Sequence, residues 1–71
     1  MRVTYDRAAD AAYIYLREID VGGSKHQCPV ECASANGMIV LDIDGDGRLI
    51  GIEVIGARDS WPPQLLALAP N

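Results

Sequence analysis

Two apolar runs that flank the letters DGDG at positions 44–47 constrain the fold of this chain more than any other feature. The first run is MIVLDI, and the second is RLIGIEVI, in which Ile50, Ile52 and Val54 alternate with other residues. Alternation with a period of two is typical of a strand with one buried face. Glycine and aspartate adopt the backbone angles that tight turns require. The pattern therefore predicts a β-hairpin over residues 38–55.

The same letters also have the spacing of a calcium-binding loop. Positions 42–53 read DIDGDGRLIGIE, with acids at loop positions 1, 3, 5 and 12 and a glycine at position 6. In a hairpin with a two-residue turn in the middle of DGDG, Leu41 lies opposite Ile50, and Glu53 lies opposite Met38. At about 3.4 Å per residue, Glu53 is then roughly 20 Å from the acids of the turn, whereas calcium ligands lie about 2.4 Å from one ion. We therefore expect no complete calcium site, and weak calcium binding at the DGDG turn is a minor alternative.

Residues 6–17 are compatible with two different structures. In the first, Asp6 caps a helix with an apolar stripe that includes Ala12 and Leu16. In the second, residues 6–10 form a turn and the following residues form a strand. The aromatic and β-branched run YIY favours the strand, and the alanines favour the helix. The residues alone leave both structures open.

The remaining segments predict two more strands and one helix. Strands are expected over residues 2–5 and 25–33, with Pro29 at an edge or a bulge, and residues 21–24 form a loop between them. A short helix is expected from Ser60 to Ala69, because serine can cap it and proline is tolerated in its first turn. The expected fold class is α+β and mostly β. It is a single domain over residues 1–71, with an antiparallel sheet of four to five strands, arranged as a meander or hairpins over residues 2–55.

Size and charge bound the function. A chain of 71 residues buries only about 60% of its unfolded surface, so a partner chain commonly supplies further burial, and we expect a homodimer. The net charge of −4 and the scattered lysines and arginines exclude nucleic acid, and they are compatible with a small basic protein as partner. No apolar run reaches the ~20 residues of a membrane span, and the N-terminus lacks the apolar stretch of a signal peptide. The expectation is a cytoplasmic protein.

The acids Asp6, Asp10 and Glu53 are candidates for catalysis, because paired carboxylates beside tyrosines can act as a general acid and its partner base. The simpler interpretation is that Asp6 and Asp10 bracket a turn and accept backbone N–H groups there. No nucleophile motif and no phosphate-binding loop occurs. Catalysis is therefore the weaker hypothesis.

Metal and cofactor sites are not expected. His26, Cys28 and Cys32 share even spacing and so project from one face of a strand, but Cys32 lies a further ~13 Å along it. That separation is too large for a shared zinc ion or for a disulfide within one strand. We expect reduced thiols, no metal and no cofactor.

An apolar stripe near the C-terminus has two interpretations. Trp61, Leu65 and Leu68 lie on one face of the expected helix. Such a face either covers the sheet of its own chain or binds a partner. These three residues are the candidate interaction surface.

Two segments, VTYDRAADAAYIYLRE and GMIVLDIDGDGRLIGIEVIGA, together resemble a bacterial domain of unknown function, the one numbered 2283. The matching residues are Tyr5, Asp6, Asp10, Tyr13, Ile14, Asp42, Asp44, Gly47, Gly51, Ile52 and Glu53. The resemblance implies strands on both sides of the DGDG turn and favours the strand over residues 11–16. It implies no enzyme activity, no cofactor and no catalytic set, and it suggests small toxin-like proteins as neighbours. The chain departs from the pattern at Arg7, where proline is common, and in the segment KHQCPVECAS.

The leading hypothesis is a non-catalytic protein-interaction module that self-associates, with a small toxin-like protein as a further partner. The alternative is a small hydrolase or ligand-binding protein that uses Asp6, Asp10 and Glu53. An enzyme with these residues should place Asp10 and Glu53 within about 10 Å of each other around a pocket.

Overall fold

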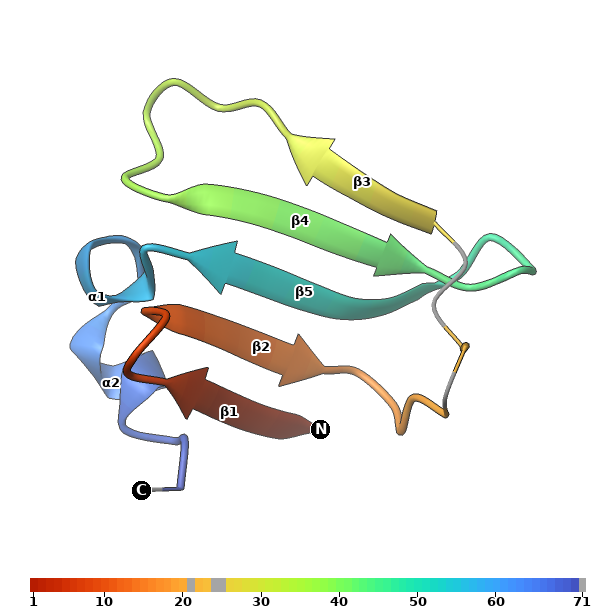
Figure 1. Ribbon diagram of the computed structural model, residues 1–71, viewed down its shortest axis with the longest axis horizontal. Coiled ribbons are helices and arrows are strands. Elements are labelled where there is room, and N and C mark those ends of the chain that lie inside the picture. The colour runs from red at the N-terminus through yellow and green to blue at the C-terminus, as the bar shows by residue number, and fades with distance from the viewer. Residues whose placement is uncertain (21, 24–25, 71) are drawn as a thin grey trace.

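Five strands and two short helices follow one another in the computed structural model, which describes residues 1–20, 22–23 and 26–70 (Figure 1). They are β1 (Arg2–Asp6), β2 (Ala11–Tyr15), β3 (His26–Val30), β4 (Met38–Ile43), β5 (Leu49–Ile55), α1 (Ala57–Ser60) and α2 (Pro63–Leu66). The strands form one antiparallel sheet in the order β1-β2-β5-β4-β3. This confirms the predicted fold class. The sheet is not a simple meander, since β2 lies between β1 and β5.

Residues 6–17 form the turn and strand, not the helix. The Asp6 carboxylate accepts the backbone N–H groups of Ala8 and Ala9, at 3.0 and 3.4 Å. The Asp10 N–H donates to the Arg7 carbonyl at 3.3 Å, and Asp10 has a φ of 50°. Aspartate is one of the few residues that adopts this left-handed conformation at low cost. The turn therefore depends on an aspartate at each of its ends.

The DGDG turn is longer than the two-residue turn that the sequence predicted. The Asp44 N–H donates to the Arg48 carbonyl at 2.9 Å, and the Gly47 N–H donates to the Asp44 carbonyl at 3.1 Å. Three residues, 45–47, therefore lie between the closing pair. Gly47 has a φ of 83°, a conformation that glycine adopts without strain.

The longer turn and a register shift at Asp42/Ile43 slide β5 along β4 by two residues relative to the prediction. Leu41 lies opposite Ile52, not Ile50, and Glu53 lies opposite Val40, not Met38. The predicted register is wrong for a physical reason: a slip of two residues keeps every side chain on its face, so alternation alone does not distinguish the two registers.

The sheet has two faces of different character. The face toward the helices, called the helix face, carries Val3, Tyr5, Ala12, Ile14, Cys28, Val30, Ile39, Leu41, Ile52 and Val54. The other face, called the open face, carries Arg2, Thr4, Tyr13, Tyr15, Gln27, Pro29, Val40, Asp42, Gly51 and Glu53. The buried core lies on the helix face, where Val3, Ala12 and Val54 meet Ala57 and Trp61.

The predicted C-terminal helix over residues 60–69 is wrong, because two four-residue helices replace it. Ser60 ends the first helix, and its hydroxyl donates to the Gly56 carbonyl at 2.8 Å. Trp61 is extended, with φ −91° and ψ 144°. The proline at position 62 causes this, since the residue before a proline is pushed out of the helical region. Neither α1 nor α2, the helices of the described residues, has the length and apolar character to cross a membrane.

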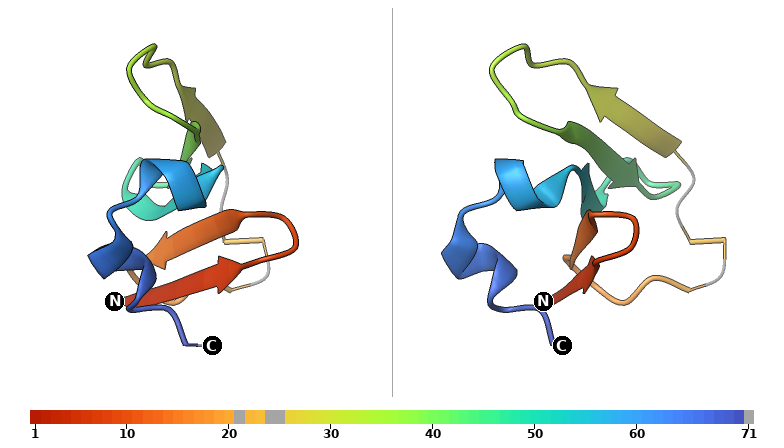
Figure 2. Two further views of the ribbon diagram at one scale, coloured as in Figure 1. Left: turned by 90° about the vertical axis from the view of Figure 1, so that its left-hand side faces the viewer. Right: turned by 60° about the vertical axis from the view of Figure 1, so that its left-hand side comes forward.

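The helices cover only part of the helix face. They lie beside β1, β2 and β5, while the half of the sheet built by β3 and β4 extends away from them (Figure 2). β3 is shorter than the predicted strand over 25–33, and every one of its residues is exposed. Lys25, and the ends of the predicted loop at Val21 and Ser24, lie outside the described residues. Pro29 lies on an edge strand, as predicted.

Candidate functional site

The structure does not bring together the three acids that the sequence singled out. The Asp6 carboxylate is bonded to the backbone of its own turn. The Asp10 carboxylate is directed toward Tyr5 and the first turn of α1, on the side of the helix face. Glu53 belongs to the open face, opposite Tyr13 and Val40. The side chains of Asp10 and Glu53 therefore lie on opposite sides of the sheet, and neither lines the hollow between β1 and α2.

Asp10 links the turn between β1 and β2 to the start of α1 through hydrogen bonds. Its side-chain Oδ1 accepts the Tyr5 hydroxyl at 2.7 Å and the Arg58 backbone N–H at 3.0 Å. Its carbonyl accepts the N–H groups of Gly56 and Ala57, at 2.8 and 3.1 Å. The Tyr5 hydrogen bond, followed by the N–H and charge of Arg58, lowers the pKa of the Asp10 carboxyl, while partial desolvation opposes this. Asp10 therefore supplies three acceptor contacts that the start of α1 requires.

A second tyrosine–aspartate pair crosses the open face. The Tyr13 hydroxyl on β2 donates to Oδ2 of Asp42 on β4, and between them lies Gly51 on β5. A Cβ at position 51 would overlap the Tyr13 hydroxyl and ring, so only glycine leaves room for the crossing. Asp42 is 5% exposed, and its Oδ1 is buried without a hydrogen-bond partner among the described residues. Burial, and then the hydrogen bond to Asp42, raise the pKa of Tyr13.

Aromatic and charged side chains extend this pair toward β1. The rings of Tyr13 and Tyr15 lie 4.5 Å apart between centroids, at an interplanar angle of 51°. The Arg2 guanidinium lies 3.9 Å above the Tyr15 ring, and its Nε lies 3.7 Å from a Glu18 carboxylate oxygen. Cation–π contacts and tilted ring pairs are stabilising. Arg2, Tyr13 and Tyr15 therefore already have favourable partners within the protein.

The turn acid Asp44 is occupied by its own backbone. Oδ1 accepts the N–H groups of Asp46 and Arg48, both at 2.9 Å, and Oδ2 accepts Arg17 at 3.1 Å. The Arg48 N–H is the largest cause that lowers the pKa of the Asp44 carboxyl. Glu53 lies opposite Val40, so four residues, or roughly 14 Å, separate it from the turn. The calcium-like spacing is the signature of a hairpin turn.

The other candidate ligands also remain apart. The part of the chain that the structure describes contains no group of three or more His, Cys, Asp or Glu side chains that could hold a metal. Cys28 and Cys32 are both free and exposed.

The predicted interaction stripe is divided between the core and the surface. Trp61 is 8% exposed and belongs to the core, and Leu65 packs against that core. Leu68 is 63% exposed. Trp61 and Leu65 therefore cover the sheet of their own chain.

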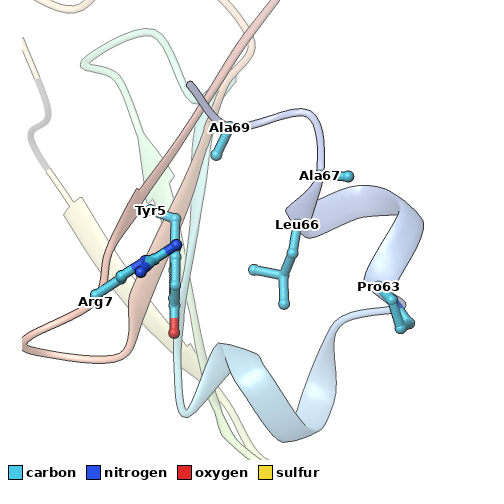
Figure 3. Close-up of a pocket in the computed structure, with 6 residues that line it drawn as sticks. All are labelled: Tyr5, Arg7, Pro63, Leu66, Ala67 and Ala69. Carbon is cyan, nitrogen blue, oxygen red and sulfur yellow. The ribbon is translucent and has the colours of Figure 1, made fainter. Parts of the chain in front are cut away.

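A hollow that the sequence did not reveal lies between β1 and α2 (Figure 3). Its volume is about 360 Å³, and its lining residues are Tyr5, Arg7, Pro63, Leu66, Ala67 and Ala69. The hollow requires the break between the two helices, which the predicted single helix did not contain. The one sequence feature that pointed to this hollow is Arg7, where the family pattern commonly has proline.

The family comparison bears on the two segments that include these tyrosines and aspartates. A family model described as a protein of unknown function, DUF2283, matches residues 2–58. The chain belongs to the DUF2283 family. The match confirms the resemblance drawn from the residues, and it ends inside α1, so Trp61 and α2 of this DUF2283 protein lie beyond the matched segment. No curated protein and no solved structure matches the chain.

Proposed function

We propose that this DUF2283 protein is a non-catalytic interaction module that self-associates, with a second copy over the β3–β4 half of the helix face. The observation that carries the proposal is the incomplete cover of that face. The core that includes the helix residues reaches β1, β2, β5 and Ile39 at the start of β4, while Cys28, Val30 and Leu41 continue the same face without a helix over them. Val30 is 39% exposed.

The size of the chain supports the same proposal. Small domains bury a low fraction of their surface, and oligomerisation is a common way to raise it. A twofold pairing lets the same apolar patch act on both copies, so that one surface supplies both halves of the interface. The uncovered half therefore suits a second copy.

Contact through the face suits this chain better than pairing through the β3 edge. The Leu16 N–H donates to the Ile50 carbonyl. This hydrogen bond shows which residues of β2 and β5 direct their backbone N–H and C=O groups toward each other. The alternation continues across β5 and β4, so Gln27 and Pro29 direct their backbone groups to the open edge. Proline has no N–H to offer, and proline on an edge strand opposes edge-to-edge pairing.

The acids support binding more than chemistry. The carboxylates of Asp6 and Asp10 accept hydrogen bonds from the protein itself, and Asp42 is buried. The net charge of −4 also supports a small basic protein as a further partner. Such a partner would bind to a different part of the surface or to the dimer.

Sedimentation equilibrium over a range of protein concentrations tests the proposal. We expect a mass of twice the 7.6 kDa chain, falling toward one chain on dilution. Val30→Asp should give the mass of a single chain, because it buries a charge in the interface. Gln27→Lys is the control: it adds one charge to the same strand on the open face, opposite Asp42, and it should leave the dimer intact. A single-chain mass for the unmodified protein at the highest concentration would contradict self-association.

A further inference from the structure

The hollow between β1 and α2 has the size of a site for a small ligand. Its volume of about 360 Å³ lies near the lower end of the roughly 300–1,000 Å³ that is usual for ligand pockets. A hollow of this size holds one ring or a short branched chain. It lies on a different part of the molecule from the β3–β4 half, so its occupation is independent of the proposed self-association.

The walls of the hollow are apolar on one side and charged at the rim. Leu66 points from α2 toward the Tyr5 ring, and Arg7 lies beside that ring (Figure 3). Pro63, Ala67 and Ala69 complete the apolar part. A mixture of apolar walls and a few polar groups is usual for a small-molecule site.

Arg7 is the group at the rim that can recognise charge. Among the described residues, the ion pairs of the arginines join Arg2 to Glu18 and Arg17 to Asp44, and none involves Arg7. The acids nearest to it in sequence already accept other donors, since Asp6 accepts backbone N–H groups of the turn.

The Tyr5 hydroxyl does not compete with Arg7 as a donor. It donates its proton to Asp10, at 2.7 Å, so its ring offers a surface for packing and its hydrogen is already used. The charges of Asp10 and Arg58 meet beside that hydroxyl and offset each other, so Arg7 supplies the net positive charge at the rim. One carboxylate, held by the planar fork of the guanidinium, fits this charge balance.

We propose that this hollow binds a small amphipathic carboxylate. Its apolar group packs between Tyr5 and Leu66, and its carboxylate accepts hydrogen bonds from the Arg7 guanidinium. Arg7 is a binding residue in this assignment, and no bond is made or broken.

An NMR titration of the backbone amides with phenylacetate tests the site. We expect saturable shifts of the Ala67 and Ala69 amides at millimolar ligand. Phenylacetamide, which has the same ring without the charge, should bind at least roughly tenfold more weakly, because a hydrogen bond to a charged group is lost. Acetate, which has the charge without the ring, should also bind more weakly.

Two variants that each remove one positive charge distinguish recognition by Arg7 from a general electrostatic effect. Arg7→Gln should weaken phenylacetate binding at least roughly tenfold. Arg2→Gln removes the same charge from the open face of β1 and should leave the affinity unchanged. Equal losses in both variants, equal binding of phenylacetate and phenylacetamide, or the absence of saturable shifts would each overturn the site. Tighter binding of a peptide that ends in phenylalanine with a free carboxylate would overturn the assignment to a free small molecule.

Discussion

The two tyrosine–aspartate pairs of this DUF2283 protein use the same chemistry on opposite faces of one sheet. On the helix face, Tyr5 donates to Asp10, whose carboxylate also accepts the Arg58 N–H. On the open face, Tyr13 donates to Asp42, which has one buried oxygen without a partner among the described residues. One pair is local and the other spans three strands.

The difference shows how surroundings determine what a hydrogen bond contributes. The Asp10 pair lies near water and a guanidinium, so the loss of one donor leaves the carboxylate with other partners. The Asp42 pair is buried, so Tyr13 is the one donor that the described residues provide. A buried polar group that loses its partner costs more than an exposed one.

The largest expected effect comes from filling the space that Gly51 leaves for the hydrogen bond between Tyr13 and Asp42. Gly51→Ala should lower the free energy of unfolding by roughly 3 kcal/mol, because the new methyl group displaces Tyr13 and leaves Asp42 unpaired. Urea denaturation measures this. In the Tyr13→Ser background the same change should cost much less, since the ring is absent, and equal costs in both backgrounds would show that the crossing is not what requires glycine.

The direct comparison of the pairs is the loss of each hydroxyl. Tyr13→Phe should cost about 2 kcal/mol and Tyr5→Phe about 1 kcal/mol or less, because Asp10 retains a donor and Asp42 does not. Both variants remove one oxygen atom from a half-buried ring on neighbouring strands, so each is the control for the other in thermal and urea unfolding. Equal losses would mean that the buried pair is not special.

Alkaline pH should act through the open face. The pKa of Tyr13 is raised above the value of 10.0 that it has in the unfolded chain. The folded state therefore holds this proton to higher pH, and stability falls as the pH rises from about 10 toward the higher pKa of the folded state. Tyr13→Phe should flatten this fall, which is measured by urea midpoints across the alkaline range. An unchanged slope in Tyr13→Phe would place the alkaline sensitivity elsewhere.

The smallest expected effect is on the acid side. The pKa of Asp10 is lowered from 3.8, so its contribution to stability is present above that pH and is lost as the pH falls through the lower folded value. Asp10→Asn should reduce the acid sensitivity of the urea midpoint, and Tyr5→Phe should reduce it in part. The pKa of Asp44 is also lowered, so some sensitivity should remain in both variants. A full acid response in Asp10→Asn would contradict this account.

The hairpin, its bend and the edge position of Pro29 could all be predicted from the sequence, because each depends on local alternation or on the chemistry of one residue. The register could not, since a slip of two residues preserves alternation and the turn length depends on Gly47. The start of α1 was missed because its contacts come from Asp10, far away in the sequence, whereas the break at Trp61 follows from Pro62 and was open to prediction. The Tyr13–Asp42 contact was missed for a related reason. It depends on the strand order β2-β5-β4, and the alternation of residues within each strand does not indicate which strands are neighbours.

The position of β2 between β1 and β5 has a consequence for how this protein is made. As the chain leaves the ribosome, β1 and β2 emerge first, but the second neighbour of β2 is β5, which is translated after the other four strands. Until then one edge of β2 is unpaired, and its apolar face is uncovered until Ala57 and Trp61 follow. A translation product that stops before residue 49 therefore lacks the middle strand of the sheet, and its exposed apolar surface makes it a ready substrate for proteases.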